Sequence, residues 1–363
     1  MQAGCRVAII GGGPSGIYCA LTLLEMSKNV DITVFERGMP LSTLLPTGGG
    51  RCNLSHNLNN GDDFKEFAKN YPRGEKFLYS IFSRYFLSET RDFFKFIGVD
   101  TYSGTDNRVF PVSNSSSFVA KRMLEKLKNQ SRVKIIKKEV KNVKDLAGFD
   151  KVVIATGSKT GYELATAYGH TVTPLAAALC GYITKQKYPP GVVLSTTDGD
   201  ILFTHQGISG PFAYKHSSIN AYKPYPFKLE VPLIDPEALS TAIAASGKKT
   251  FLNILSQFVP KSLASVLSEH GERQACHIKK EEIKRLEKLV FDVLSPDSKG
   301  ETVRAGGVSL KEINSNMQSK INEHVYFCGE VLDIDGFCGG FNLQSCWSTA
   351  AVAALSITGA ISK

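Results

Sequence analysis

Strand-like and helix-like patterns alternate at the start of the 363-residue chain. Arg6–Ile10 is an almost continuous apolar run, which predicts a short buried strand. From Ile17 to Leu24 the apolar residues recur with the spacing of one buried helix face. The sequence DITVFERG then predicts a second strand that ends at Glu36. This order of strand, helix and strand predicts an α/β fold with a parallel sheet.

The later pattern predicts that this fold is interrupted. Lys151–Ser158 is a further strand that leads into glycine, and short strands of a small β-barrel are expected after Tyr168. From Asp235 to about Pro296 the pattern turns helical, and a last strand ends at Gly329 before a last helix. We predict a discontinuous Rossmann-like domain (1–172 and 300–363), a β-barrel-like insertion (173–234) and a helical insertion (235–299).

The turn between the first strand and helix carries a Gly-x-Gly-x-x-Gly motif at Gly11, Gly13 and Gly16. The first glycine permits a tight turn, the second lets a pyrophosphate approach the backbone, and the third lets the helix pack closely on the strand. The helix N-terminus offers N–H groups to the phosphates, and the Ser15 hydroxyl can add a donor. Glu36 lies twenty residues after Gly16, where an acid holds the ribose hydroxyls of an adenosine. These features predict a dinucleotide site.

A second glycine-rich loop, Thr47–Asn53, has the sequence TGGGRCN. Three successive glycines indicate a backbone that passes close to a flat or charged group, and an ordinary loop is the alternative. Arg51 supplies a planar cation, and the Asn53 amide both donates and accepts hydrogen bonds. Cys52 has no identifiable catalytic partner, so a small buried residue is favoured over a nucleophile.

The stretch GEVLDIDGFCGGFNLQ, Gly329–Gln344, follows the last predicted strand. Gly339 and Gly340 free the backbone to approach a ring, and the N–H groups of the helix that starts there can face negative charge. A reduced flavin carries such charge near its pyrimidine carbonyl, and the acids of the loop can hold the hydroxyls of a ribityl chain. The stretch therefore predicts one wall of a flavin site.

Composition narrows the alternatives. No stretch reaches about 18 continuous apolar residues, so no membrane-spanning helix is predicted. No signal-peptide pattern opens the chain, so we expect a mature cytoplasmic protein. The eight cysteines include no Cys-x-x-Cys pair, which favours reduced thiols, and no zinc-ligand spacing or other metal site is predicted.

Positive charge is concentrated in one segment. The net charge is +9, and between Lys121 and Lys151 eleven basic residues accompany four acids. This surplus is compatible with a nucleic-acid partner, although a solvated helix and strand face is the favoured explanation.

The motifs occur in the order of a known family. GGGPSG, TGGGRCN, RVFP, ATGS, YGHT, THQGISGP, AGGVSLKEI and GEVLDIDGFCGGFNLQ span Gly11–Gln344, nearly the full chain. As a set they resemble the BaiN-like flavoproteins, a family that includes aminoacetone oxidases and NAD(P)/FAD-dependent oxidoreductases. The resemblance implies an FAD-binding domain of glutathione-reductase type, built from both ends of the chain, with an inserted small β-barrel and a helical piece.

The resemblance and the motifs together predict the residues that bind FAD non-covalently. Val140 is included because the family's strand there touches adenine through its backbone. Phe341 and Cys338 replace the Tyr and Thr common in the family, which leaves the substrate open. The predicted residues are Gly11, Gly13, Pro14, Ser15, Gly16, Glu36, Arg37, Gly50, Arg51, Cys52, Asn53, Val140, Thr156, Gly157, Gly329, Glu330, Asp335, Gly340, Asn342 and Leu343.

The sequence therefore predicts an FAD-dependent oxidoreductase that transfers hydride at the flavin N5. FAD occupies the one dinucleotide motif, so NAD(P)H is expected as a transient electron donor over the flavin. NAD(P)H-linked reduction of a small enone-type substrate is the main hypothesis. The alternatives are an oxygen-dependent oxidase of a small amine such as an aminoketone, an RNA-binding or RNA-modifying flavoprotein, and a flavin-binding protein without turnover. His205 is a candidate proton donor, with a structural histidine as the alternative.

Overall fold

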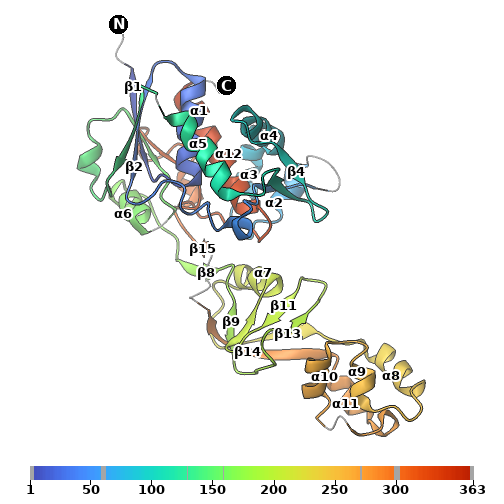
Figure 1. Ribbon diagram of the computed structural model, residues 1–363. Coiled ribbons are helices and arrows are strands. Elements are labelled where there is room, and N and C mark those ends of the chain that lie inside the picture. The colour runs from blue at the N-terminus through green and yellow to red at the C-terminus, as the bar shows by residue number, and fades with distance from the viewer. Residues whose placement is uncertain are drawn as a thin grey trace. The chain divides into compact units, whose positions relative to one another are not determined.

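Two compact units make up the chain (Figure 1). The computed structural model describes residues 4–58, 63–128, 130–157, 159–269, 272–297 and 303–359. One unit comprises Met1–Leu175 with Arg304–Lys363, and the other comprises Ala176–Val303. The predicted boundary at residues 299 and 300 lies outside the described residues, as does Ser158 of the ATGS motif.

A parallel sheet forms the centre of the first unit, which confirms the predicted α/β fold. Its strands lie in the order β16-β7-β1-β2-β6, and every ladder between them is parallel. The carboxyl ends of all five strands therefore lie along one edge of the sheet. The strands are β1 (Cys5–Ile10), β2 (Val30–Glu36), β6 (Val133–Lys137), β7 (Lys151–Ile154) and β16 (Val325–Phe327).

Helices from both ends of the chain pack together in this unit. α1 (Pro14–Met26) contacts α5 (Ser116–Leu127) and α12 (Phe341–Ile357), and Figure 1 shows the three side by side. α12 can approach α1 closely because its buried face is rich in alanine and serine. The last helix of the chain therefore completes the core that the first strand and helix begin.

Shorter elements complete the first unit. In an antiparallel sheet of order β3-β5-β4, the edge strand β3 also contacts α12. Most aromatic residues of the helices in this part are buried in or packed against the core, whereas Phe96 is exposed. These elements are β3 (Ser55–His56), β4 (Thr101–Ser103), β5 (Arg108–Pro111), α2 (Phe64–Ala68), α3 (Glu75–Phe82), α4 (Leu87–Phe96) and α6 (Lys159–Ala167).

The second unit has a separate hydrophobic core and a sheet of order β10-β11-β12-β9-β14-β13. Its helices are α7 (Pro211–Ile219), α8 (Pro236–Ala244), α9 (Phe251–Leu255), α10 (Lys261–Leu267) and α11 (Lys280–Arg285). Its strands are β9 (Tyr182–Thr184), β10 (Val193–Leu194), β11 (Ile201–Phe203), β12 (Gly207–Ser209), β13 (Phe227–Pro232) and β14 (Lys288–Pro296). The strands β8 (Ala176–Ala178) and β15 (Val303–Ala305) lie at the two unit boundaries.

The second unit differs from the expected structure in two respects. Residues 288–296 form strand β14 instead of a helix, because Leu289, Phe291 and Val293 alternate inward and pair with β13. Among the described residues no ladder joins the end strands β10 and β13, so the sheet is not closed into a barrel.

Candidate functional site

The turn after β1 has the close approaches that its glycines predicted. Gly11 has φ +107°, and a methyl group there would lie 2.6 Å from the Ala155 carbonyl oxygen. A methyl group on Gly16 would lie 3.0 Å from the Gly11 carbonyl carbon, so α1 can pack here only without a side chain. α1 begins at Pro14 after Gly13, and no side chain caps it. Its first N–H groups are therefore available to an anion.

Three strand ends meet beside this turn. Gly329 follows β16 with φ +76°, and a methyl group there would lie 2.8 Å from the Ser15 Cβ. Gly157 follows β7 with φ +60°, and its nearest side-chain neighbour is Glu330. The sheet order explains the meeting, because β7 lies between β1 and β16. Predicted residues from three distant motifs thus line one edge.

The end of β2 supplies the acid expected beside an adenosine. Glu36 Oε2 accepts a hydrogen bond from the Gly12 amide at 2.7 Å, and Oε1 accepts one from the Gly38 amide at 2.7 Å. The carboxylate is therefore fixed against the glycine loop, and each oxygen keeps a lone pair for a hydroxyl. Arg37 is exposed next to it. Val140 is buried, so only its backbone is suited to contact a ligand.

The TGGGRCN loop forms a left-handed turn. Gly48, Gly49 and Gly50 have φ values of +58°, +66° and +86°, which side chains rarely adopt. A methyl group on Gly49 or Gly50 would meet nothing within 4 Å, so the backbone there borders open space. The Arg51 guanidinium lies 4.4 Å from the centre of the Phe110 ring, which holds the cation beside the loop.

The N-terminus of α12 lies against the end of this loop. Gly340 precedes the helix with φ +101°, and no side chain caps it. A methyl group on Gly340 would lie 2.8 Å from Asn53 Oδ1. Asn53 is 8% exposed, and its buried Oδ1 has no hydrogen-bond partner among the described residues. An uncapped helix end and an unsatisfied amide oxygen therefore share one place, which favours a bound polar group.

Several predicted FAD contacts have structural partners for their side chains. The Asn342 amide exchanges two hydrogen bonds with the Gly336 backbone, at 2.7 and 2.9 Å, and closes the loop before α12. Thr156 turns its hydroxyl toward Gly161 of α6. Cys52 is fully buried, and burial raises the pKa of its thiol to about 12, so it is not a nucleophile. Leu343 is half-buried against the core.

Acidic side chains cluster after β16. Burial, with a smaller contribution from the neighbouring Asp335 carboxylate, raises the pKa of Glu330 to about 7. Asp335 is completely buried, and both of its oxygens accept hydrogen bonds from the Arg73 guanidinium. Burial also raises the pKa of Asp333. The site therefore contains carboxyl groups that are neutral or charged according to their partners.

Three side chains at this site were missed by the sequence interpretation. Arg73 holds Asp335, and the Tyr71 hydroxyl donates to the Phe341 carbonyl at 2.6 Å. His56 Nδ1 lies 3.1 Å from the Gly339 carbonyl oxygen. Arg73 and Tyr71 lie in the loop NYPRGEK, and no motif marks them, because only the fold brings them to residues some 270 positions away.

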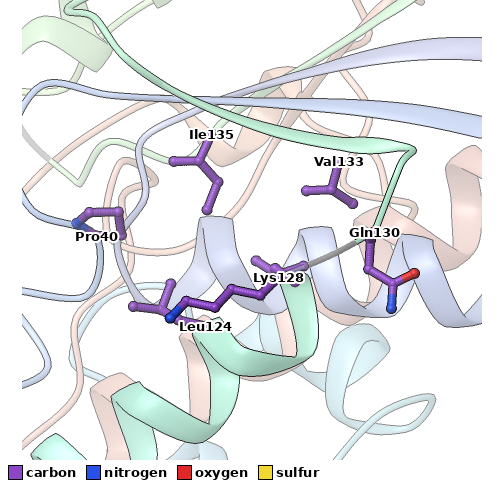
Figure 2. Close-up of a pocket in the computed structure, with 7 residues that line it drawn as sticks. Pro40, Leu124, Lys128, Gln130, Val133 and Ile135 are labelled. Atoms are coloured by element: carbon purple, nitrogen blue, oxygen red, sulfur yellow. The ribbon is translucent and has the colours of Figure 1, made fainter.

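His205 lies in the second unit, and one surface hollow of the first unit has no predicted FAD contact in its lining. His205 is exposed in the turn between β11 and β12, in the other unit. Figure 2 shows a hollow of about 320 Å³ between the end of α5 and β6. It is lined by Pro40, Leu124, Leu127, Lys128, Gln130, Val133 and Ile135, none of which is a predicted FAD contact. The described residues include no group of His, Cys, Asp and Glu side chains suited to a metal ion.

The first unit fits FAD. The uncapped α1 and its glycine turn suit the pyrophosphate, and Glu36 suits the adenosine ribose. Of the acids after β16, Asp335 is bound to Arg73, so Glu330 is the one better suited to the ribityl hydroxyls. The Gly49–Gly50 backbone and the α12 N-terminus with Asn53 suit the flavin ring.

Within the described residues no helix is both long and apolar enough to cross a membrane.

Comparisons with known proteins agree with this geometry. The model of the family "HI0933-like protein Rossmann domain" matches residues 5–356. A protein of Clostridium scindens named 3-dehydro-bile acid delta(4,6)-reductase is 28% identical, over 96% of this chain and 98% of its own length. A protein of Haemophilus influenzae named ribosomal RNA dihydrouridine synthase is 27% identical, over 96% of this chain and 98% of its own length. A solved flavocytochrome c3 fumarate reductase is 13% identical, covers 99% of this chain and 78% of its own, and has a TM-score of 0.49.

The motif resemblance is thus confirmed at the level of the HI0933-like family, while its specific BaiN and aminoacetone-oxidase assignments stay predictions. The chain belongs to the HI0933-like family, and it is an oxidoreductase with a Rossmann-type unit whose geometry fits a flavin.

Proposed function

We propose that the protein reduces a carbon–carbon double bond conjugated to a carbonyl group, with NAD(P)H as the electron donor and FAD as the hydride carrier. The observation that carries the proposal is the uncapped N-terminus of α12 beside the unsatisfied Asn53 Oδ1. The positive end of the helix favours the negative charge of a reduced flavin. Bound FAD supplies two-electron chemistry, and the chain's residues position it and exclude water.

The names of the two relatives support this reaction class. A delta(4,6)-reductase acting on a 3-dehydro compound adds hydrogen to double bonds conjugated with a ketone. Dihydrouridine has two hydrogens more than uridine, and they are added across uridine's ring double bond, which is conjugated with a ring carbonyl. Both names describe addition of hydrogen to a carbonyl-conjugated double bond, so we take this bond type as the substrate class.

A second candidate is a uridine in RNA, and the basic segment favours it. Lys128, Lys134 and Lys137 are exposed on the end of α5 and on the edge strand β6, and no described carboxylate forms an ion pair with them. Lys128 also lines the apolar hollow of Figure 2, together with Val133 and Ile135 of β6. β6 pairs Lys137 with Glu36, so the basic strip runs to the predicted adenosine end. Phosphates would bind such a strip in a salt-dependent way.

Anaerobic stopped-flow spectroscopy tests these candidates. The purified FAD-loaded protein is mixed with NADH, then with NADPH, and the bleaching of the flavin absorbance identifies the donor. The reduced protein is then mixed with 2-cyclohexenone, with a 3-keto-4-ene steroid, or with a uridine-containing RNA. Reoxidation by the two enones supports the main proposal, and reoxidation by RNA alone supports the second. Reduction of the flavin by an aminoketone and reoxidation by oxygen, with no response to any enone, would contradict both.

The RNA candidate has a separate binding test. RNA affinity is measured at several salt concentrations for the wild type and for K134E/K137E. If each lysine neutralises one phosphate, the salt slope of log affinity falls by roughly 2 in the double variant. Equal affinity and equal slope for both proteins would rule out this strip as the RNA surface.

A further inference from the structure

His56 has one nitrogen fixed and one nitrogen available. Nδ1 lies 3.1 Å from the Gly339 carbonyl oxygen, which can only accept, so Nδ1 carries a hydrogen. Nε2 is therefore the nitrogen that takes up a second proton when the ring becomes an imidazolium. Nε2 has no hydrogen-bond partner among the described residues. The ring is also held in orientation, because it stacks on Phe341 with centroids 4.8 Å apart and an interplanar angle of 24°.

This ring lies at the N-terminus of α12. A methyl group on Gly339 would lie 3.5 Å from His56 Nδ1, and Gly340 borders the carbonyl of Ser55. The unsatisfied, buried Asn53 Oδ1 is at the same helix end and independently indicates a bound polar group there. His56 is half-buried, so it combines a fixed position with an accessible Nε2.

The charged neighbours of His56 are one cation and one anion, which form an ion pair with each other. β3 pairs His56 with Arg108 of β5, and Arg108 forms a 3.4 Å ion pair with Asp106. The first turn of α12 contains no acid. Burial lowers the pKa of His56, with Arg108 acting in the same direction and the Gly339 carbonyl and Asp106 opposing it. The free protein therefore holds the ring mainly as neutral imidazole at neutral pH, and a negative charge placed beside the ring would favour its protonation.

We propose that His56 Nε2 donates the proton that completes reduction of the conjugated double bond, an inference that rests on the proposed function. A reduced flavin, when bound, would supply the hydride (one proton with two electrons) that the substrate's β carbon takes up as the π bond breaks. The α carbon receives a proton from the His56 imidazolium, so two C–H bonds form. The substrate is reduced, the flavin is oxidised, and the neutral imidazole recovers its proton from water.

Reoxidation of the pre-reduced protein tests this role. For the FAD-loaded wild type, H56N and H56Q, we measure reoxidation by 2-cyclohexenone between pH 5.5 and 8.5. We expect both variants to lose about 100-fold or more in rate and to lose the decline that the wild type shows as the imidazole deprotonates. Reoxidation by ferricyanide needs no proton on carbon, so it should be equal in all three proteins. FAD content and near-ultraviolet circular dichroism show that the variants are folded.

A second readout is independent of turnover. In protein labelled with ¹³C at histidine Cε1, the signal that disappears in H56N identifies His56. Its pKa should rise when the flavin is reduced, because the added negative charge favours the imidazolium. If the wild type leaves 2-cyclohexenone unchanged but this pKa rises, the proposed reaction fails and the placement of His56 stands. An unchanged pKa, or equal rates and pH profiles for wild type and H56Q, would overturn the inference.

Discussion

His170 and Ser319 are 149 positions apart in the chain, yet His170 Nε2 lies 2.8 Å from Ser319 Oγ in the buried interior. His170 Nδ1 lies 3.2 Å from Glu312 Oε2, and the Ser319 oxygen accepts the amides of Ile321 and Asn322. The Ser319 hydroxyl therefore donates to Nε2, and Nδ1 donates to Glu312. Two motifs of the sequence, YGHT and AGGVSLKEI, thus join to hold the segment before β16.

We expect H170A to lower the free energy of unfolding by roughly 3 kcal/mol, because two buried hydrogen bonds are lost and a cavity forms. Urea denaturation at pH 7.5 measures the change. H324A is a suitable control, since His324 is an exposed histidine on the same segment. A loss no larger than that of H324A would show that the His170 contacts contribute nothing.

The same histidine gives a signed pH dependence. Burial lowers the pKa of His170 below its ordinary value of 6.5. The unfolded chain therefore takes up the proton first, and the free energy of unfolding falls as the pH decreases below about 6.5. The difference between wild type and H170Q, followed from pH 7.5 to 5.5, should shrink in that direction. A difference in the free energy of unfolding that stays constant with pH would contradict a neutral His170 in the folded protein.

The change of stability with pH that Glu330 predicts has the opposite sign to that of His170. Its folded pKa is raised from 4.5 to about 7. Below the unfolded value the carboxyl group is neutral in both states, and as the pH rises to about 7 the folded protein loses stability relative to E330Q. The loss should be on the order of 3 kcal/mol. Denaturation of the FAD-free proteins between pH 4.5 and 8 measures it, and parallel curves would exclude a raised pKa.

Arg73 should be needed to keep Asp335 charged in the interior. The Asp335 side chain is 0% exposed and the Arg73 side chain 14% exposed, so R73L leaves a buried carboxylate without this partner. We expect a loss of about 3–5 kcal/mol in stability and weaker FAD retention. The double variant R73L/D335N should recover part of that stability. If R73L and wild type unfold at the same urea concentration, the pair is not stabilising.

Gly50 and Gly340 form a matched pair for the ring side of the site. Both have positive φ, so either alanine variant costs about 1 kcal/mol of backbone strain. G340A adds a clash with Asn53 and should be the less stable protein, whereas G50A meets open space. If FAD passes over Gly50, G50A weakens FAD binding with little further loss of stability. Fluorescence titration with FAD measures this, and unchanged affinity would place the flavin away from Gly50.

Local pattern was sufficient for the parts of the fold that are decided locally. The apolar run of β1, the glycine turn and the amphipathic α1 were predicted because adjacent residues contribute all of their signal. Strand β14 was missed, since KLVFDVLSP follows a helical segment and only pairing with β13 selects the strand.

The sequence by itself determined that the chain has one dinucleotide motif, a strand that ends in Glu36, and glycine loops at Gly48–Gly50 and Gly339–Gly340. Only the tertiary structure decided what those loops face. The parallel sheet order brings Gly11, Gly157 and Gly329 to one edge, and α12 packing brings Gly340 to Asn53 and His56. Arg73 and His56 could not be found in advance, because a side chain's partner across some 260 to 280 residues depends on packing and leaves no local signal.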